Sequence, residues 1–505
     1  MLRSRNTWNV WMVVMVVVLM AAASTHAAIT KWTGGGDGTR WSDPLNWDNG
    51  VPGGTDTAAL WGNVGGGTSI TVYVEEGDQA VNNIETFRGV ILEGTDQDDA
   101  TERKLTLNGN ITGVLGASDH SGTVSIKCDL ELTGDTVWDV TARAGSTIAV
   151  SRVVSETVQS DITIRNTGTS TNDSTFSADP TITGDLIILE GRTQALVTGW
   201  GSTLNSIILG DTTGDKDVVL ATGSGQSIVA PIVVRAGSSG YRGIQVGHTW
   251  NGGTLTGPTI ALGGDLTFVN NGPLAVYNTM SGVGGVVQNG ATTIGTRLTA
   301  DNTNQGDTDV TTGVLIVAGT TSGQGDYIIR ADGSLTGDGQ IGLASGKAVT
   351  VQSGGTLLPG NCTSTRTPLT TQVIGELTID GDLVLLDGAE LEFQLGDDVV
   401  AGTDYDTVTL LSDLTLDGTL NVTQMGGFDA TTGVYTLFSG VDALTDNGLE
   451  TSGLDGIDHW IDTTQTGFVY LRTGETAPIA AIPEPAGLGL IGLALLAVRR
   501  KRSPL

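Results

Sequence analysis

Short runs of alternating apolar and polar residues recur along the interior of the chain. Each run begins at a glycine, continues two positions later with Leu, and returns to an apolar residue two positions after that. Examples are Gly184–Ile188, Gly264–Phe268, Gly375–Ile379, Gly381–Leu385 and Gly418–Val422. Because alternate side chains of a strand point to opposite faces, the pattern predicts short, half-buried strands. Glycine at the preceding turn permits a positive φ.

Many short strands without helical periodicity between them leave three architectures open: a sandwich, a barrel and a parallel β-solenoid. The repeat favours the solenoid, in which each coil stacks on its neighbours and buries a continuous aliphatic stripe. We therefore predict an all-β parallel β-helix over residues 29–472. A polar stretch, Asp301–Asp309, places an expected boundary near residue 300, between an N-terminal part (29–300) and a second part (301–472).

The composition supports a folded chain and limits the kinds of partner that it can bind. Glycine accounts for 75 of 505 residues, 38% of residues are hydrophobic and 16% are charged. A hydrophobic fraction of that size in regular alternation can form a core, which disordered chains lack. The chain carries 55 acidic and 24 basic residues, a net charge of -31. A surface this acidic repels nucleic acid, so no nucleic-acid partner is expected.

The N-terminal segment has the order of a secretory signal peptide. Arg3 and Arg5 precede an apolar stretch, Val10–Ala23, and the small residues Ala27 and Ala28 follow it. The alternative is a membrane anchor, but the apolar stretch is shorter than the roughly 18 residues that a spanning helix needs. We expect residues 1–28 to form a signal helix that directs the chain to the secretion translocon.

The C-terminal segment has three elements in a fixed order. A Pro-Glu-Pro motif comes first, an apolar run over Ala486–Val498 second and a basic stop last; the residues are Pro483, Glu484 and Pro485, and Arg499, Arg500, Lys501 and Arg502. A helix of the thirteen apolar residues would be about 20 Å long, short of a hydrocarbon core of roughly 30 Å. An Ala, Pro and Thr-rich spacer, residues 473–482, precedes the motif.

This tail (483–505) resembles the PEP-CTERM sorting signal of Gram-negative bacteria. The resemblance implies that a membrane-embedded, exosortase-type enzyme processes a chain held transiently in the membrane by its short apolar helix. It also implies a final location at the cell surface or in the extracellular matrix.

A second resemblance lies within the later repeats. The ordered series Val310–Val317, Gly333–Gly342, Gly354–Asn361 and Gly388–Phe393 is similar to the autotransporter-associated β-strand repeat of bacterial passenger domains. That family forms right-handed parallel β-helices, so the resemblance implies the same fold here.

Tryptophan is concentrated near the start of the predicted mature chain, at Trp32, Trp41, Trp47 and Trp61. Exposed faces of Trp41, Trp47 and Trp61 could stack on sugar rings, which makes them candidate glycan-stacking residues and an extracellular polysaccharide a candidate partner. Alternatively, large aromatic side chains cover the open end of a solenoid efficiently.

Catalytic motifs are absent around the three histidines of the predicted mature chain, His120, His248 and His459. Gly337–Gly342 fits the pattern Gly-x-Gly-x-x-Gly, but no helix is expected after it, so a dinucleotide site is rejected. We predict a structural or adhesive envelope or matrix protein that is not an enzyme. The alternative is a polysaccharide-binding protein, lyase or glycosidase on a β-helix scaffold.

Two acidic turns and two cysteines complete the candidate chemistry. Asp211–Asp217 and Asp301–Asp309 group several oxygen ligands that would suit Ca²⁺, yet Asp and Asn are also ordinary turn residues. We therefore predict no metal or cofactor. Cys128 and Cys362 are 234 positions apart, which in an elongated fold favours separate thiols or an intermolecular bridge over an internal disulfide.

Overall fold

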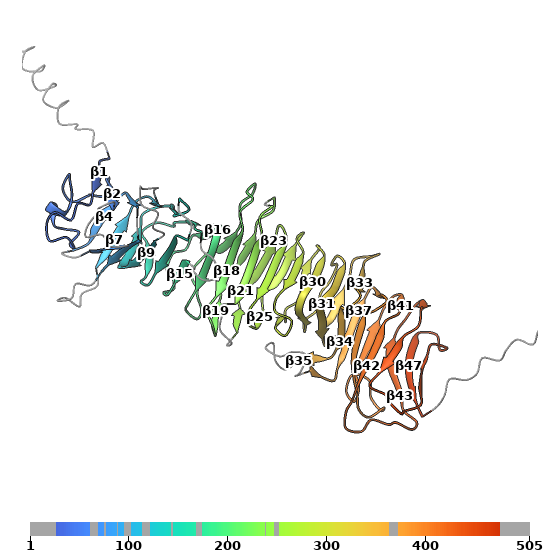
Figure 1. The fold of residues 1–505 in the computed structure, drawn as a ribbon. Coiled ribbons are helices and arrows are strands. Elements are labelled where there is room, and N and C mark those ends of the chain that lie inside the picture. The colour runs from blue at the N-terminus through green and yellow to red at the C-terminus, as the bar shows by residue number, and fades with distance from the viewer. Residues whose placement is uncertain are drawn as a thin grey trace, which may run out of the picture.

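The computed structural model describes residues 27–60, 69–74, 77–87, 89–94, 103–113, 122–142, 145–167, 174–237, 239–246, 252–362 and 372–474. These residues form a long rod, with residue 27 at one end and residue 474 at the other (Figure 1). The described ranges contain strands and one short 3-10 helix, η1 (Pro44–Asn46). The all-β prediction is therefore confirmed, while the signal helix and the apolar tail helix lie outside the described residues.

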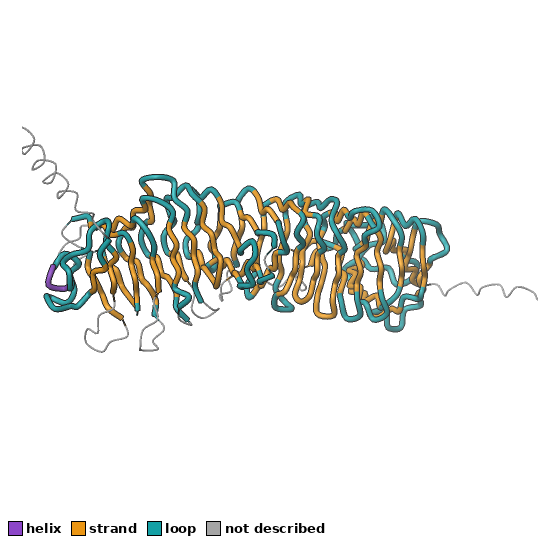
Figure 2. The backbone as a smooth tube through the Cα atoms, turned by 90° about the horizontal axis from the view of Figure 1, so that it is seen from above, coloured by secondary structure: helices purple, strands orange, loops and turns teal. Residues whose placement is uncertain are grey.

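The chain winds in coils, and each coil places one strand on each of three faces of the rod. A typical coil contains β17 (Ser206–Leu209), β18 (Val218–Thr222) and β19 (Gln226–Ile228). The next strand, β20 (Ile232–Val234), pairs in parallel with β17, one full coil earlier. Repetition of this coil gives a 35-stranded parallel sheet that runs along the rod (Figure 2). This is the predicted parallel β-helix.

The first strands of successive coils form face 1. These are β1 (Ile29–Lys31), β2 (Thr57–Leu60), β5 (Asn83–Thr86), β8 (Ile111–Gly113), β11 (Thr136–Asp139), β14 (Ile162–Arg165), the start of β16 (Asp185–Ala195), β17, β20, β23 (Thr259–Leu262), β26 (Thr279–Gly282) and β29 (Thr303–Asn304), then β32 (Gln340–Gly342), β37 (Glu376–Asp380), β40 (Thr407–Leu410) and β43 (Val434–Ser439).

The second strands form face 2. These are β3 (Ser69–Tyr73), β6 (Gly89–Glu93), β9 (Thr123–Lys127), β12 (Thr147–Val150), β15 (Ser174–Phe176), the end of β16, β18, β21 (Arg242–Val246), β24 (Leu266–Asn270), β27 (Val286–Asn289), the starts of β30 (Thr308–Val317) and β31 (Tyr327–Gly337), β33 (Ala348–Val351), β38 (Asp382–Leu385), β41 (Leu414–Leu416) and β44 (Leu444–Asp446).

The third strands form face 3. These are β4 (Gln79–Val81), β7 (Lys104–Leu107), β10 (Asp129–Leu132), β13 (Val154–Glu156), β19, β22 (Gly253–Leu255), β25 (Leu274–Val276), β28 (Gly295–Leu298), the ends of β30 and β31, β34 (Thr356–Pro359), β39 (Glu390–Leu395), β42 (Thr419–Gln424) and β45 (Glu450–Ser452). A small antiparallel pair, β35 (Asn361–Cys362) and β36 (Gln372–Val373), branches from the coil after β34.

The alternating pattern of the sequence correctly predicts which residues form the core. All five Gly-x-Leu phrases lead into strands, and the Leu of each is buried inside the rod; these residues are Leu186, Leu266, Leu377, Leu383 and Leu420. The role expected of the glycines is correct at Gly381 and Gly418, which have positive φ. Gly184 is needed for a different reason, because an added Cβ there would lie 2.0 Å from the carbonyl oxygen of Ser160 in the adjacent coil.

The stack continues across residue 300 without a break in pairing. β28 pairs with the end of β30, and β30 pairs with β31 along most of its length. The polar stretch Asp301–Asp309 comprises the two residues before β29, β29 itself, the turn after it and the start of β30. Strand pairing is therefore continuous from the N-terminal part into the second part.

Strand direction reverses at the C-terminal end of the rod. β47 (Phe468–Thr473) pairs antiparallel with β43 and with β46 (His459–Asp462). This hairpin extends face 1 beyond the final coil and places one strand that runs the other way, β47, at the C-terminal end of the rod (Figure 1).

Candidate functional surfaces

Three tryptophans pack together at the N-terminal end of the rod. The ring centroids of Trp32 and Trp47 are 4.9 Å apart and those of Trp41 and Trp47 are 5.1 Å apart, in edge-to-face contacts. The indole N–H of Trp47 donates to the carbonyl oxygen of Trp41 (2.8 Å). Such pairs add to the stability that burial of the rings already supplies.

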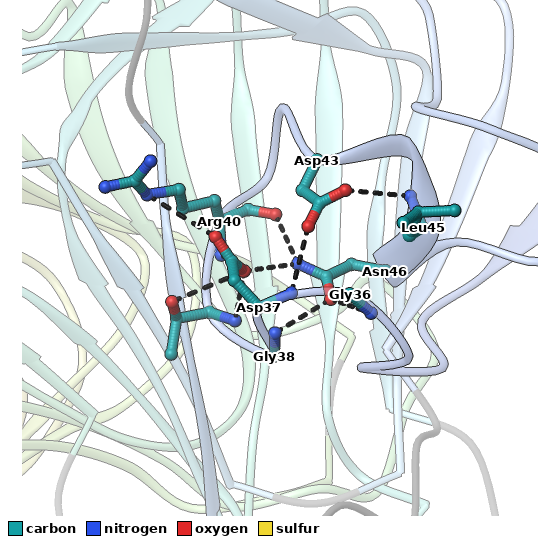
Figure 3. Close-up of polar contacts among 8 residues, drawn as sticks. Gly36, Asp37, Gly38, Arg40, Asp43, Leu45 and Asn46 are labelled. Atoms are coloured by element: carbon teal, nitrogen blue, oxygen red, sulfur yellow. Dashed lines mark hydrogen bonds and ion pairs between the residues drawn. The ribbon is translucent and has the colours of Figure 1, made fainter.

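The same segment of the chain contains a polar loop, residues 36–46, built around Asn46 (Figure 3). Asn46 is fully buried, and its Oδ1 accepts from the backbone N–H groups of Gly36 (3.0 Å) and Gly38 (2.9 Å). Its Nδ2 donates to Asp37 Oδ1 (2.8 Å) and to the carbonyl oxygen of Arg40 (2.9 Å). All the donor and acceptor groups of the Asn46 amide are therefore used inside the loop.

Two aspartates complete the same loop. Asp43 accepts from the backbone N–H of Asp37 (2.9 Å) and, as N-cap of η1, from that of Leu45 (2.9 Å). Asp37 accepts from the backbone N–H groups of Thr39 (2.9 Å) and Arg40 (3.0 Å). The side chains of Asp37, Asp43 and Asn46 therefore form hydrogen bonds with the backbone of their own loop. The loop is a folded plug.

The expectation that Trp41 and Trp47 present exposed faces is wrong. Their exposed fractions are 0% and 4%, because Trp47 packs between Trp32 and Trp41 over the first coil. A sugar ring cannot stack on faces that other rings already cover. The alternative interpretation, a hydrophobic cap on the open end of the solenoid, describes both residues; Trp61 lies outside the described residues.

A repeated contact at the start of strands was missed in the sequence. The residue just before or at a strand start is Asp or Asn, and its side chain accepts from the backbone N–H of the equivalent residue one coil later. Asp135 accepts from Asp161 (3.0 Å), and Asp161 accepts from Asp185 (2.8 Å). We call this set of contacts the strand-start ladder.

The strand-start ladder extends along the rod on faces 1 and 2. The further acceptor and donor pairs are Asn83 and Asn110, Asn110 and Val137, Asp217 and Tyr241, Asp265 and Gly285, Asp307 and Asp326, Asp326 and Ala348, Asp382 and Asp413, and Asp413 and Ala443. A signal for it was present, because three of the Gly-x-Leu phrases have Asp as the middle residue: Asp185, Asp265 and Asp382.

The two acidic turns considered for Ca²⁺ belong largely to such contacts. Asp217, Asp301 and Asp307 accept from backbone N–H groups of the next coil. Asp309 forms an ion pair with Arg330, and Asp211 lies 3.8 Å from Arg165. Across the described ranges, no three His, Cys, Asp or Glu side chains are grouped as metal ligands.

An aromatic and cationic strip lies on the outer side of the C-terminal hairpin. Phe468 is 39% exposed and stacks on Tyr470, with ring centroids 5.6 Å apart. The Arg472 guanidinium lies 5.6 Å from the centroid of Tyr470 and 5.9 Å from that of Trp460. Arg472 also donates to Asp462 (2.6 Å). Face 1 thus ends in side chains that could contact a flat apolar ligand.

Asp406 is a buried carboxyl group and a candidate acid site. It precedes β40 and is fully buried, and it accepts from the backbone N–H groups of Gly375 (2.8 Å) and Gln394 (2.7 Å). Burial raises the pKa of Asp406 to about 7, against the lowering effect of the two donors. The group joins two neighbouring coils and touches no described cleft.

The remaining candidates occupy ordinary structural positions. His459 contacts Thr451 (2.6 Å) and the carbonyl oxygen of Ile457 (2.7 Å), while His120 and His248 lie outside the described residues. Cys128 is a free, buried thiol whose pKa burial raises to about 12. The side chain of Cys362 is not described. Gly337–Gly342 ends in a strand, β32.

Comparison with models of known protein families and with curated proteins gives no match for this chain. Among the described residues, no helical segment has the length and apolar character needed to cross a bilayer. Both sets of tail residues, Pro483, Glu484 and Pro485 and the basic stop Arg499–Arg502, lie outside the described residues, as does most of the predicted signal peptide.

Proposed function

We propose that the protein is an exported structural or adhesive component of the cell envelope or extracellular matrix, and that it is not an enzyme. The observation that carries this proposal is a single continuous parallel solenoid with a built plug at one end and a reversed hairpin at the other. Such a rod offers long, regular faces for contact with other surfaces.

The location is part of the proposal and rests on the two ends of the sequence. Export through the translocon and processing by an exosortase-type enzyme follow from the resemblance of residues 483–505 to a PEP-CTERM signal and from the signal-peptide pattern of residues 1–28. The first described strand, β1 (Ile29–Lys31), lies directly after the expected cleavage point, which is compatible with a mature chain that begins there.

The test of location is the intact mass of the protein from its native host, combined with fractionation of the cells. Loss of residues 1 to about 28 and of the tail, with the product on the surface or in the matrix, would support sorting. A full-length tail retained in a membrane fraction would contradict it and make the tail an anchor.

A second candidate function is polysaccharide binding at the C-terminal hairpin. The exposed ring of Phe468, stacked on the half-buried ring of Tyr470 beside Arg472, favours it, because aromatic faces and guanidinium groups bind sugar rings and their acidic substituents. Phe468→Ala should then abolish retention on immobilised host polysaccharide, whereas Leu411→Ala, another exposed apolar residue, should not. Equal retention of both variants would exclude this site.

A further inference from the structure

Polar side chains interrupt an aliphatic column of the core near the middle of the rod. On face 1, the strand register aligns inward residues of successive coils in the order Ile232, Ile260, Met280, Asn302, Thr321, Ile341 and Ile379. All of them are buried, including Asn302 and Thr321. Two polar side chains therefore take core positions that apolar side chains occupy in the coils before and after them.

A second column of the core, on face 2, is interrupted in the same part of the rod. The register aligns the inward residues Phe268, Gln288, Val310 and Ile329. Gln288 is fully buried, and its Oε1 accepts from the hydroxyl of Thr296 (2.6 Å). Its Nε2 has no hydrogen-bond partner among the described residues. A buried donor that lacks an acceptor costs free energy on folding.

Three more buried polar side chains form a chain of hydrogen bonds where face 1 turns into face 2. The hydroxyl of Tyr327 donates to Gln324 Oε1 (2.5 Å), and Gln324 Nε2 donates to Asn304 Oδ1 (2.9 Å). At the end of this chain, Asn304 Nδ2 has no partner within the part of the protein that the structure describes. A buried polar network that is only partly satisfied destabilises the elements it joins.

The strand pairing of face 1 is also thin in these coils. β29 has two residues and is the last face 1 strand of the 35-stranded sheet, whereas β32, the next face 1 strand, belongs to a six-stranded sheet. Isolated bridges link the two sheets on this face, Asn302 with Thr321 and Thr320 with Gln340. Fewer backbone hydrogen bonds therefore hold face 1 together here than in the coils on either side.

We propose that residues 279–329, from β26 to the start of β31, form a joint that opens locally while the coils on both sides stay folded. Each coil of a solenoid is stabilised by its own core and by its contacts with the neighbouring coils. Coils with unpaired amides in the core and thin pairing on one face therefore open at a lower free energy than other interior coils. Opening there lets the two arms of the rod bend relative to each other. The inference concerns the folded rod alone, so it holds or fails independently of the proposed function.

Native-state hydrogen exchange of the purified protein, read by mass spectrometry of its peptides, tests the joint. We expect the strand amides of the joint to exchange faster, by about tenfold or more, than those of two flanking regions. One region runs from β17 to β23 (residues 206–262) and the other from β37 to β42 (residues 376–424). A smaller difference from either region, or slower exchange in the joint, would overturn the proposal.

The substitution Gln288→Leu tests the cause. It removes the unpaired Nε2 and makes the face 2 column apolar from Phe268 to Ile329, so exchange in the joint should slow by about tenfold. The matched control is Val287→Leu, which changes the adjacent half-buried residue on the outward side of the same strand and should leave exchange unchanged. Unchanged or faster exchange in Gln288→Leu, or the same change in both variants, would overturn the assignment of the joint to its polar core.

Discussion

At the scale of single residues, Asp406 shows how burial changes the chemistry of an acid. Its two oxygens accept backbone N–H groups from Gly375 and Gln394, which favours the ionised form, but removal from water disfavours it more strongly. The result is a carboxyl group with a pKa of about 7 inside the rod. Folding therefore favours its neutral form over a range of pH in which the unfolded chain is ionised.

This arrangement predicts a pH dependence of stability. A folded pKa above the unfolded value of about 3.9 gives a contribution that is fully present at low pH and is lost as the pH rises from about 4 to about 7. Wild-type protein should lose roughly 3 kcal/mol more than Asp406→Asn over that range, in urea unfolding followed by circular dichroism. Stability curves that run parallel for the two proteins would contradict the assignment.

Asn46 is the residue on which the N-terminal plug depends most. Its amide makes four hydrogen bonds within the loop that supports Trp41 and Trp47. Asn46→Ala should lower the free energy of unfolding of the plug by roughly 2–4 kcal/mol, because buried partners are left unsatisfied. Leu45→Ala, next in sequence but 70% exposed, should change it little. Hydrogen exchange in residues 27–60 measures both effects.

At the scale of elements, the sequence pattern predicts the strands well and their connections poorly. Alternation identifies the inward positions, such as Leu383 and Leu420, because burial on one face leaves a direct mark on residue type. The strand-start ladder leaves a weaker mark, the Asp of three Gly-x-Leu phrases, because Asp in a turn is equally common when it bonds to its own loop. Trp47 was placed at the correct end of the fold, but its exposure depends on Trp32 and Trp41 packing around it, which no local pattern specifies.

The strand-start ladder predicts a difference between two substitutions at one position. Asp161→Asn keeps a side-chain oxygen that can accept from the backbone N–H of Asp185, so stability should change by only a few tenths of a kcal/mol. Asp161→Ala removes the acceptor and should cost about 1 kcal/mol. Chemical denaturation of both variants measures the difference; equal losses would mean that charge, and not the hydrogen bond, is what matters at this position.

At the scale of the whole molecule, the two ends matter more than any interior coil. An open solenoid end exposes unpaired backbone groups and a cross-section of the core, which is a surface for association. Here Trp32, Trp41 and Trp47 cover one end, and the antiparallel β46 and β47 extend the other.

Removal of the N-terminal plug should therefore convert the protein into one that associates end to end. A chain shortened by residues 27–60 exposes the face 1 strand β5 and the core beneath it. Light scattering should show concentration-dependent growth of the shortened protein, with no such growth for the full chain. A shortened protein that stays monomeric would mean that the first coils close themselves without the plug.

The direction of the hydrogen bonds between coils also fixes how the rod responds to force. Parallel strands are joined by bonds that run along the rod axis, so tension between residues 27 and 474 pulls those bonds apart a few at a time and does not shear a whole sheet. Each released coil would lengthen the chain in a discrete step: the 24 residues from Asp161 to Asp185 span roughly 80 Å when extended. Stretched by its ends, the protein would yield coil by coil and act as an extensible tether with a long reach.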